Sequence, residues 1–260
     1  MLKKYLKIYL HFFKMNILRR MAYRWNFFIL MIMIPLHIGI YIFFIKIIYS
    51  NLESIAGWDF YHSLLIVASM VFIEATAWAT CSFMNELRRY IRDGNLDGVI
   101  TKPIDAQFLA SVSKVDPEDL SRFIIAIGII IYVLSHIHFS LIDFLLYFFI
   151  LFNGFIIFYS ILVLIAVIAF WVVENRALFF ISKNIIQISQ YPTDIYTGIM
   201  KTVFSFIIPI AFIATVPAKV LSGWYDWKLV MESFIIAGIF FYLSRKFFLF
   251  GLRHYSSASS

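Results

Sequence analysis

The chain has 260 residues, of which 62% are hydrophobic and 14% are charged, whereas a typical soluble domain carries about 25% charged residues. This composition excludes a disordered chain and an ordinary soluble enzyme. The single cysteine, Cys81, cannot form a disulfide within the chain, so a disulfide scaffold is excluded as well. The formal net charge is +7, and its uneven distribution carries more information than its sum.

Continuous apolar runs predict an all-α membrane protein, because a helix needs about 20 apolar residues to cross the hydrocarbon core. Six runs reach or approach that length within residues 25–250. The six predicted transmembrane helices cover residues 25–48, 61–84, 123–139, 144–173, 195–216 and 233–250. The third is short, and the fourth is long enough to tilt or to break near Asn153 and Gly154. The fifth contains Lys201 near one end and Pro209 inside it.

Lys and Arg side chains predict the orientation of these spans. Seven of them, and no acid, precede the first span, and six lie in the loop 85–122. The loop 51–60 has none, and two follow Pro217 before the last span. The positive-inside rule therefore places both termini in the cytoplasm, with residues 251–260 as a cytoplasmic tail of a protein in the bacterial plasma membrane.

Residues 1–24 have the pattern of an amphipathic helix at the membrane surface. Lys3, Lys7, His11 and Lys14 share one helical face, and an adjoining face is apolar. Such a helix lies in the headgroup layer and binds membrane lipid through its lysines. The segment is either a topology signal alone or an elbow that also supports the first span against a partner subunit.

The loop 85–122 is the longest polar stretch, with six basic and seven acidic residues. This balance does not fit nucleic-acid binding, which requires a basic excess. Residues 85–91 are expected to continue the second span, and Gly94 is expected to end that helix with a positive φ. Leu96, Val99 and Ile100 form a short apolar ridge before Pro103. The ridge favours a docking element over the alternative, a solvated connector.

One run within this loop resembles a signature of bacterial type-2 ABC transporter permeases. The run is Arg92-Asp93-Gly94-Asn95-Leu96-Asp97, followed by Ile100 and Lys102-Pro103. Gln190-Tyr191-Pro192 and the stretch 208–212 with Pro217 also resemble that family. These permeases are six-span exporter subunits and include the daunorubicin- and viologen-resistance-like proteins.

The resemblance implies that the loop carries a coupling helix, which binds in a groove of a separate ABC ATPase subunit. It also implies two copies of that ATPase and a second permease, in a homodimer or a heterodimer. The coupling candidates are Arg88, Arg92, Asp93, Gly94, Leu96, Asp97, Ile100 and Pro103. No G-x-x-x-x-G-K-[ST] motif occurs, so ATP and Mg are expected on the partner ATPase, and the chain itself is expected to bind no cofactor and to be no enzyme.

Glu74 and four later residues are the polar and gate candidates within the membrane. A carboxylate in hydrocarbon costs at least about 2.5 kcal/mol, so Glu74 should face protein or water. It either lines the substrate path or pairs with another subunit, or it hydrogen-bonds to Ser, Thr or Asn on a neighbouring helix. Tyr191 and Pro192 precede the fifth span, and Pro209 and Pro217 bend it, as an outer gate by family resemblance or as a fixed kink.

Two other functions remain as alternatives. An intramembrane enzyme could use Glu74 and Asp143, but acid–base chemistry needs groups that converge within about 3 Å or through one water. An ion-driven secondary transporter often shows inverted repeats and broken helices at the midplane, and this sequence shows no internal repeat.

Overall fold

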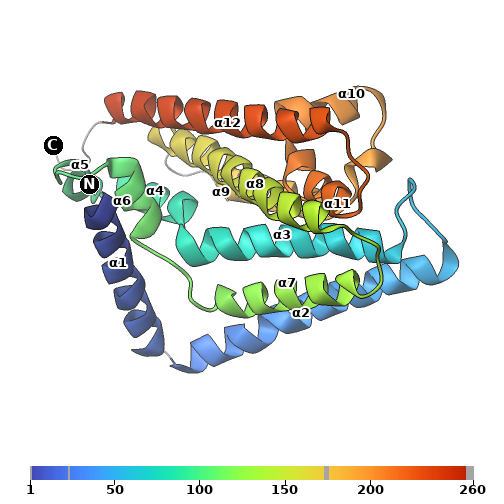
Figure 1. Cartoon of the computed structure of the whole chain (residues 1–260). Helices are drawn as coiled ribbons and strands as arrows, with labels where there is room; N and C mark the ends of the chain where they lie inside the picture. The colour runs from blue at the N-terminus through green and yellow to red at the C-terminus, as the bar shows by residue number, and fades with distance from the viewer. Residues whose placement is uncertain (1, 23, 173–175, 256–260) are drawn as a thin grey trace.

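The computed structural model describes residues 2–22, 24–172 and 176–255. Apart from an isolated bridge between Ile55 and Trp58, these residues form helices, turns and connecting segments (Figure 1). One end of the bundle carries α1 (Leu2–Ala22), α4 (Phe83–Arg92), α5 (Asp97–Ile100) and α6 (Ala106–Val112). The opposite end carries α10 (Gly198–Thr202) and α11 (Thr215–Leu221). We name these the α5 end and the α10 end.

Within the described residues, four helices are long and apolar enough to cross a membrane. They are α2 (Arg24–Asn51), α3 (Phe60–Thr80), α8 (Leu141–Val167) with the 3-10 turn Ile168–Phe170, and α12 (Trp227–Arg253). They correspond to the first, second, fourth and sixth predicted spans. Residue 173, the predicted end of the fourth span, and residues 256–260 of the predicted tail lie outside the described residues.

The third predicted span corresponds to a helix that is shorter than the hydrocarbon core is thick. α7 (Asp119–Leu134) has 16 residues, which gives a length of about 24 Å at 1.5 Å per residue. The hydrocarbon core is about 30 Å thick. α7 packs along α3, the most extensive contact of α3 with any helix.

The prediction of one continuous span over residues 195–216 is wrong. This range contains the last residue of a 3-10 turn, Thr193–Ile195, then α10, a π-helical turn, a second 3-10 turn and the start of α11. Proline explains the main interruption, because the residue before proline is disfavoured in the helical region. Ile208, which precedes Pro209, has φ −123° and ψ 83° and ends the π-helical turn.

A helix occupies the preceding segment, which the sequence analysis treated as a loop. α9 (Arg176–Ile188) follows Trp171, whose ring stacks on Phe247 near the end of α12 with 5.7 Å between centroids. After α9, Asp194 accepts a 3.1 Å hydrogen bond from the Trp58 indole in the loop between α2 and α3. The segment 171–194 therefore runs from the α5 end to the α10 end.

The second predicted span does not continue past residue 80. Cys81 is extended, with φ −154° and ψ 107°, and α4 begins after it as a separate helix. The backbone N–H of Ser82 donates to the carbonyl oxygen of Ser111 over 3.1 Å, and that of Asp116 donates to Trp78 over 3.1 Å. These bonds give partners to backbone groups that lose their helical hydrogen bonds where α3 breaks.

α8 forms the centre of the bundle and packs against α12, α3 and α11. A Cβ at Gly154 would lie 2.9 Å from both the Ile213 carbonyl oxygen and Ile73 Cδ1, so glycine permits a close approach of chain to chain here. α8 continues without a break at Asn153 and Gly154. Asn153 instead donates a 2.9 Å hydrogen bond to Ser233 of α12.

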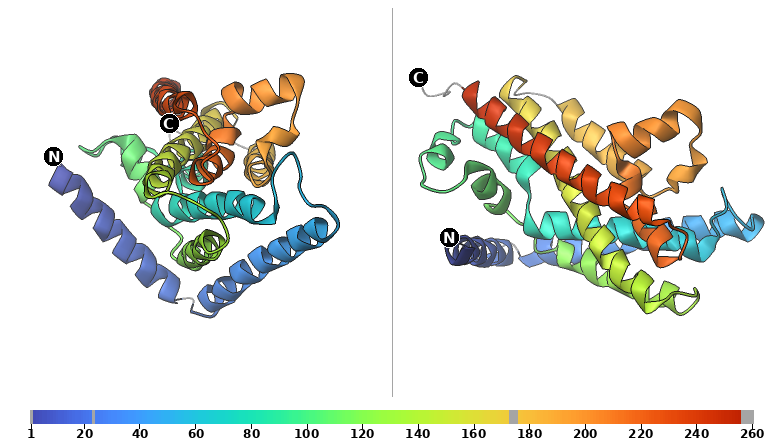
Figure 2. Two further views of the ribbon diagram at one scale, coloured as in Figure 1. Left: turned by 45° about the vertical axis from the view of Figure 1, so that its right-hand side comes forward. Right: turned by 45° about the horizontal axis from the view of Figure 1, so that its top comes forward.

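α1 lies across the direction of the long helices (Figure 2). Arg20 forms ion pairs with Asp116 and with Glu118, the latter at 3.0 Å. Asn16 donates a 3.2 Å hydrogen bond to the carbonyl oxygen of Ser113. α1 is thus fixed to the segment that joins α6 to α7.

Candidate functional site

The first candidate site is the turn between α4 and α6 at the α5 end, which we name the α5 knuckle (residues 92–103). α4 ends at Arg92, and Gly94 follows with φ +68°, as the sequence predicted. A left-handed conformation of this kind favours glycine. The chain then reverses, and the N–H of Leu96 donates to the carbonyl oxygen of Tyr90 over 3.1 Å.

The predicted apolar ridge of the knuckle is divided between core and surface. Leu96 is fully buried, and Val99 is 5% exposed. Ile100 is 41% exposed, and its neighbours Thr101, Lys102 and Pro103 are exposed as well. Leu96 and Val99 therefore anchor the knuckle, while Ile100 leaves an apolar side chain exposed at its surface. An α-helical period explains this division, because adjacent residues point about 100° apart.

The knuckle and the end of α4 also carry charged residues. Arg92 Nε donates to Asp93 Oδ1 over 2.8 Å, and this hydrogen bond holds the pKa of the Asp93 carboxyl below its usual range. Arg88 is half-buried on α4, and Asp97 is the half-buried first residue of α5. The knuckle therefore exposes both charged side chains, Arg92 and Asp93, and an apolar one, Ile100.

A salt bridge that the sequence analysis missed connects the segment after the knuckle to α12. Arg245 of α12 pairs with Asp105, which directly precedes α6, and it donates a 3.0 Å hydrogen bond to Gln107. The partners are 140 residues apart in sequence, so no local pattern indicates the pairing. The contact links the segment after Pro103 to α12.

The second candidate site is a polar cluster between α3 and α7. Glu74 Oε1 lies 3.1 Å from Arg122 Nη1, and Arg122 also lies 2.9 Å from Asp119 Oδ1. The three side chains are between 10% and 20% exposed. Glu74 thus pairs with an arginine of its own chain, a partner that neither sequence interpretation named. Glu74 and Arg122 border a cavity of about 290 Å³. Its other polar walls come from α2, from α9 and from the turn after α9, namely His37, Tyr41, Lys183, Gln187 and Gln190.

The four gate candidates lie after α9, and the structure brings only some of them together. Pro192 is buried, and the N–H of the following Thr193 donates to Thr215 Oγ1 of α11 over 3.2 Å. Tyr191 instead faces α2, with its ring edge-on to Tyr41 at 6.3 Å. Pro209 and Pro217 are both buried. Pro217 is the third residue of α11, and a first turn tolerates proline because its N–H groups need no partner within the helix.

The two carboxylates of the alternative enzyme belong to separate networks. Glu74 pairs with Arg122, as described above. Asp143 accepts a 2.9 Å hydrogen bond from the N–H of Ser140 and a 3.0 Å hydrogen bond from the Tyr225 hydroxyl at the α10 end. Each carboxylate therefore has a local structural role.

The four long apolar helices of the described residues define a multi-pass helical membrane protein. The sequence matches the profile of the ABC-2 family transporter proteins over residues 35–259. The chain belongs to this family. Its members are permease subunits rather than catalytic ATPases, and they generally pair with an ABC ATPase. No curated protein and no solved structure matches the chain in the corresponding comparisons.

Proposed function

We propose that this chain is the transmembrane permease subunit of an ATP-driven exporter in the bacterial plasma membrane. Two permeases, as a homodimer or a heterodimer, would form the path, and two copies of a separate ATPase would bind ATP and Mg. The observation that carries the proposal is the α5 knuckle, whose Leu96 and Val99 are buried while Ile100 is exposed. The resemblance to daunorubicin- and viologen-resistance-like permeases supports export as the direction.

Six crossings follow from the order of the helices if α7 and α9 are counted with the four long ones. α2 runs toward the α10 end, α3 returns, and the connections at each end alternate in the same way up to α12 (Figure 1). α9 then replaces residues 195–216 as the fifth crossing, and residues 198–221 fold back within the α10 end. Lys and Arg are more numerous in α1 and the loop 85–122 than in the loop 51–60, which has none, and this difference supports a cytoplasmic α5 end.

Coupling would proceed from the knuckle into the bundle through packed contacts. Closure of the ATPase pair displaces Ile100 and its neighbours, and the buried Leu96 transmits that displacement to α4. α4 packs against α8, and Asp105 is paired with Arg245 of α12. The two helices would then move with the knuckle and change the exposure of a path between two permeases. Glu74, Tyr191, Pro192, Pro209 and Pro217 remain the candidates that line or gate this path.

The test is the substitution Ile100→Asp in the assembly purified from its native host. A charge on the apolar contact should lower both the recovered ATPase and the permease-stimulated ATP hydrolysis at least about tenfold, because central apolar contacts of an interface often contribute 2 kcal/mol or more. Ile100→Val retains the apolar contact, and Ser54→Asp adds a charge to the exposed loop at the α10 end. Both controls should behave as wild type. Unchanged association and hydrolysis in Ile100→Asp would refute the docking role.

A further inference from the structure

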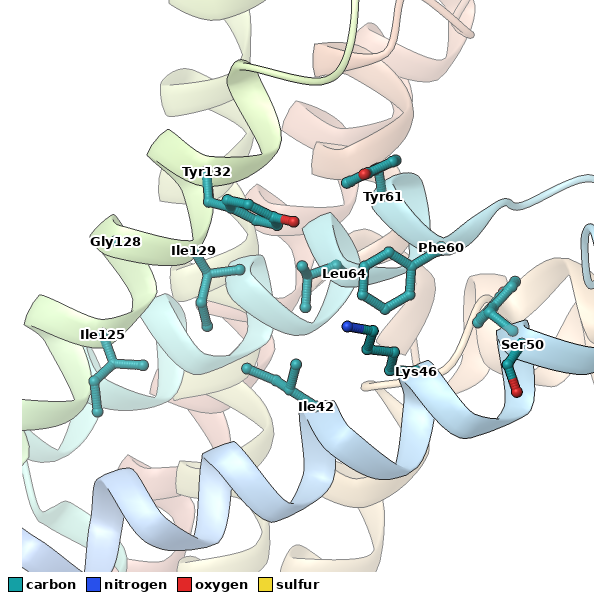
Figure 3. A pocket seen from close by; sticks show the side chains of 11 residues that line it. Ile42, Lys46, Ser50, Phe60, Tyr61, Leu64, Ile125, Gly128, Ile129 and Tyr132 are labelled. Carbon is teal, nitrogen blue, oxygen red and sulfur yellow. The ribbon is translucent and has the colours of Figure 1, made fainter.

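A cavity of about 820 Å³ lies between α2, α3 and α7, and we name it the Lys46 pocket (Figure 3). Its apolar wall includes Ile42, Leu64, Ile125 and Ile129, and its polar groups include Lys46 and Tyr132. The volume is within the range of about 300–1,000 Å³ that small-molecule sites occupy. Lys46 and Tyr132 are both exposed, so the pocket opens on the side of the bundle.

The polar and apolar groups of the pocket lie at different depths. Lys46 is five residues before the end of α2 at Asn51, and Tyr132 is two residues before the end of α7 at Leu134. At 1.5 Å per residue, Ile42 lies about 6 Å deeper along α2 than Lys46, and Ile125 lies about 10 Å deeper along α7 than Tyr132. The pocket is therefore polar near the helix ends and apolar toward the middle of the bundle.

Lys46 gives the pocket a positive charge. Figure 3 shows its ammonium pointing into the cavity, near Ile42 and Phe60. The described side chains that line the cavity include no carboxylate. An anion in the pocket would therefore meet the ammonium beside apolar walls, where the interaction is stronger than in bulk water.

Gly128 of α7 lines the pocket and leaves open space beside it. A methyl group at this position would have no other atom within 4 Å, apart from its own helix backbone. A larger side chain at residue 128 therefore has room to occupy the pocket without displacing a neighbour.

We propose that the Lys46 pocket binds an anionic phospholipid of the membrane leaflet at the α10 end. Its phosphate would contact the Lys46 ammonium and the Tyr132 hydroxyl, and one acyl chain would lie along Ile42 and Ile125. The charge and the depth of the groups select this occupant, because a phospholipid is anionic at its headgroup and apolar below it. The proposal is independent of the direction of transport and of the ATPase contact.

The test is native mass spectrometry of the purified assembly with added phosphatidylglycerol or phosphatidylcholine. Lys46→Gln should weaken phosphatidylglycerol binding about fivefold and leave phosphatidylcholine unchanged. Gly128→Leu should weaken both at least about tenfold by filling the pocket. The matched controls are Lys201→Gln, at an exposed lysine of α10, and Gly238→Leu, at an exposed glycine of α12 with equally open surroundings. Both should bind lipid as wild type.

Three results would overturn the proposal. The first two are equal binding of the two lipids by wild type and unchanged phosphatidylglycerol binding in both pocket variants. The third is a photo-crosslinker at residue 128 that reacts with a second copy of the chain instead of lipid. If Gly128→Leu fails to fold, Gly128→Ala and Lys46→Gln decide the outcome. The smaller methyl group should weaken binding by less than the leucine, in the same direction for both lipids.

Discussion

Glu74 is an acidic residue on a predominantly apolar helix, α3, and its surroundings explain how its charge is tolerated. Arg122 lies between the carboxylates of Glu74 and Asp119, at 3.1 Å and 2.9 Å. A charge removed from water is expensive, and a nearby opposite charge with good geometry offsets much of that cost. Removal of the arginine would leave two carboxylates without their central cation.

We expect Arg122→Gln to destabilise the fold by about 3 kcal/mol, because breaking a buried ion pair on one side leaves an uncompensated charge. The measurement is the free energy of unfolding in mixed detergent micelles. Lys228→Gln is the control, because the Lys228 side chain is 80% exposed and lies 3.9 Å from Glu232, and such exposed pairs contribute about 0.5 kcal/mol or less. Equal stability of Arg122→Gln and wild type would show that the cluster does not stabilise the bundle.

Among the helices, α8 packs against α12, α11, α4 and α3. Gly154 sets how closely the neighbouring chain can approach α8. A methyl group at residue 154 would have too little space on this face of α8. Ile213, Ile73 and Phe212 each have an atom within 3.0 Å of a Cβ at this position. Backbone atoms make up part of that contact and cannot rotate away.

We expect Gly154→Ala to destabilise the protein by about 1–3 kcal/mol through overpacking. Gly238→Ala, in α12, should be neutral or stabilising by about 0.5–1 kcal/mol, because nothing lies within 4 Å of that position and alanine favours a helix. Thermal unfolding of both variants in the same detergent checks the difference. A melting temperature of Gly154→Ala at or above that of Gly238→Ala would contradict the packing argument.

The same elements show how far a single sequence predicts this fold. Continuous apolar runs identified α2, α3, α8 and α12, because burial in lipid requires apolar residues all around a helix. α9 was missed because Lys183 and Gln187 interrupt its hydropathy, and both border the polar cavity. The same analysis predicted Gly94 and its positive φ from local turn chemistry. The link between Arg245 and Asp105 could not be predicted, since only the tertiary fold brings these residues together.

The whole molecule has two ends that differ in charge and in structure. Lys and Arg are distributed unevenly between them, and α1 and the α5 knuckle occupy only one of them. α1 and the knuckle lie at the same end of the bundle (Figure 2). The loop that contains Ser54 lies at the other end, where Trp58 contacts Asp194. The positive-inside rule predicts that the first of these ends is cytoplasmic.

We expect a membrane-impermeant maleimide to label Ser54→Cys from outside intact cells and to label Ile100→Cys only after permeabilisation. Both positions are exposed, whereas the native Cys81 is buried and should give little background. Labelling is read on the purified chain by mass spectrometry. The reverse pattern would invert the topology and separate the α5 knuckle from any cytoplasmic ATPase.

The most direct measurement is photo-crosslinking from residue 100 in the intact assembly, with benzoylphenylalanine in place of Ile100. A second probe replaces Ile199, which is 82% exposed at the α10 end. We predict a covalent adduct between residue 100 and an ABC ATPase subunit, with none from residue 199. An active assembly in which residue 100 forms no ATPase adduct, while another surface of the permease does, would contradict the assignment of the α5 knuckle as the coupling element.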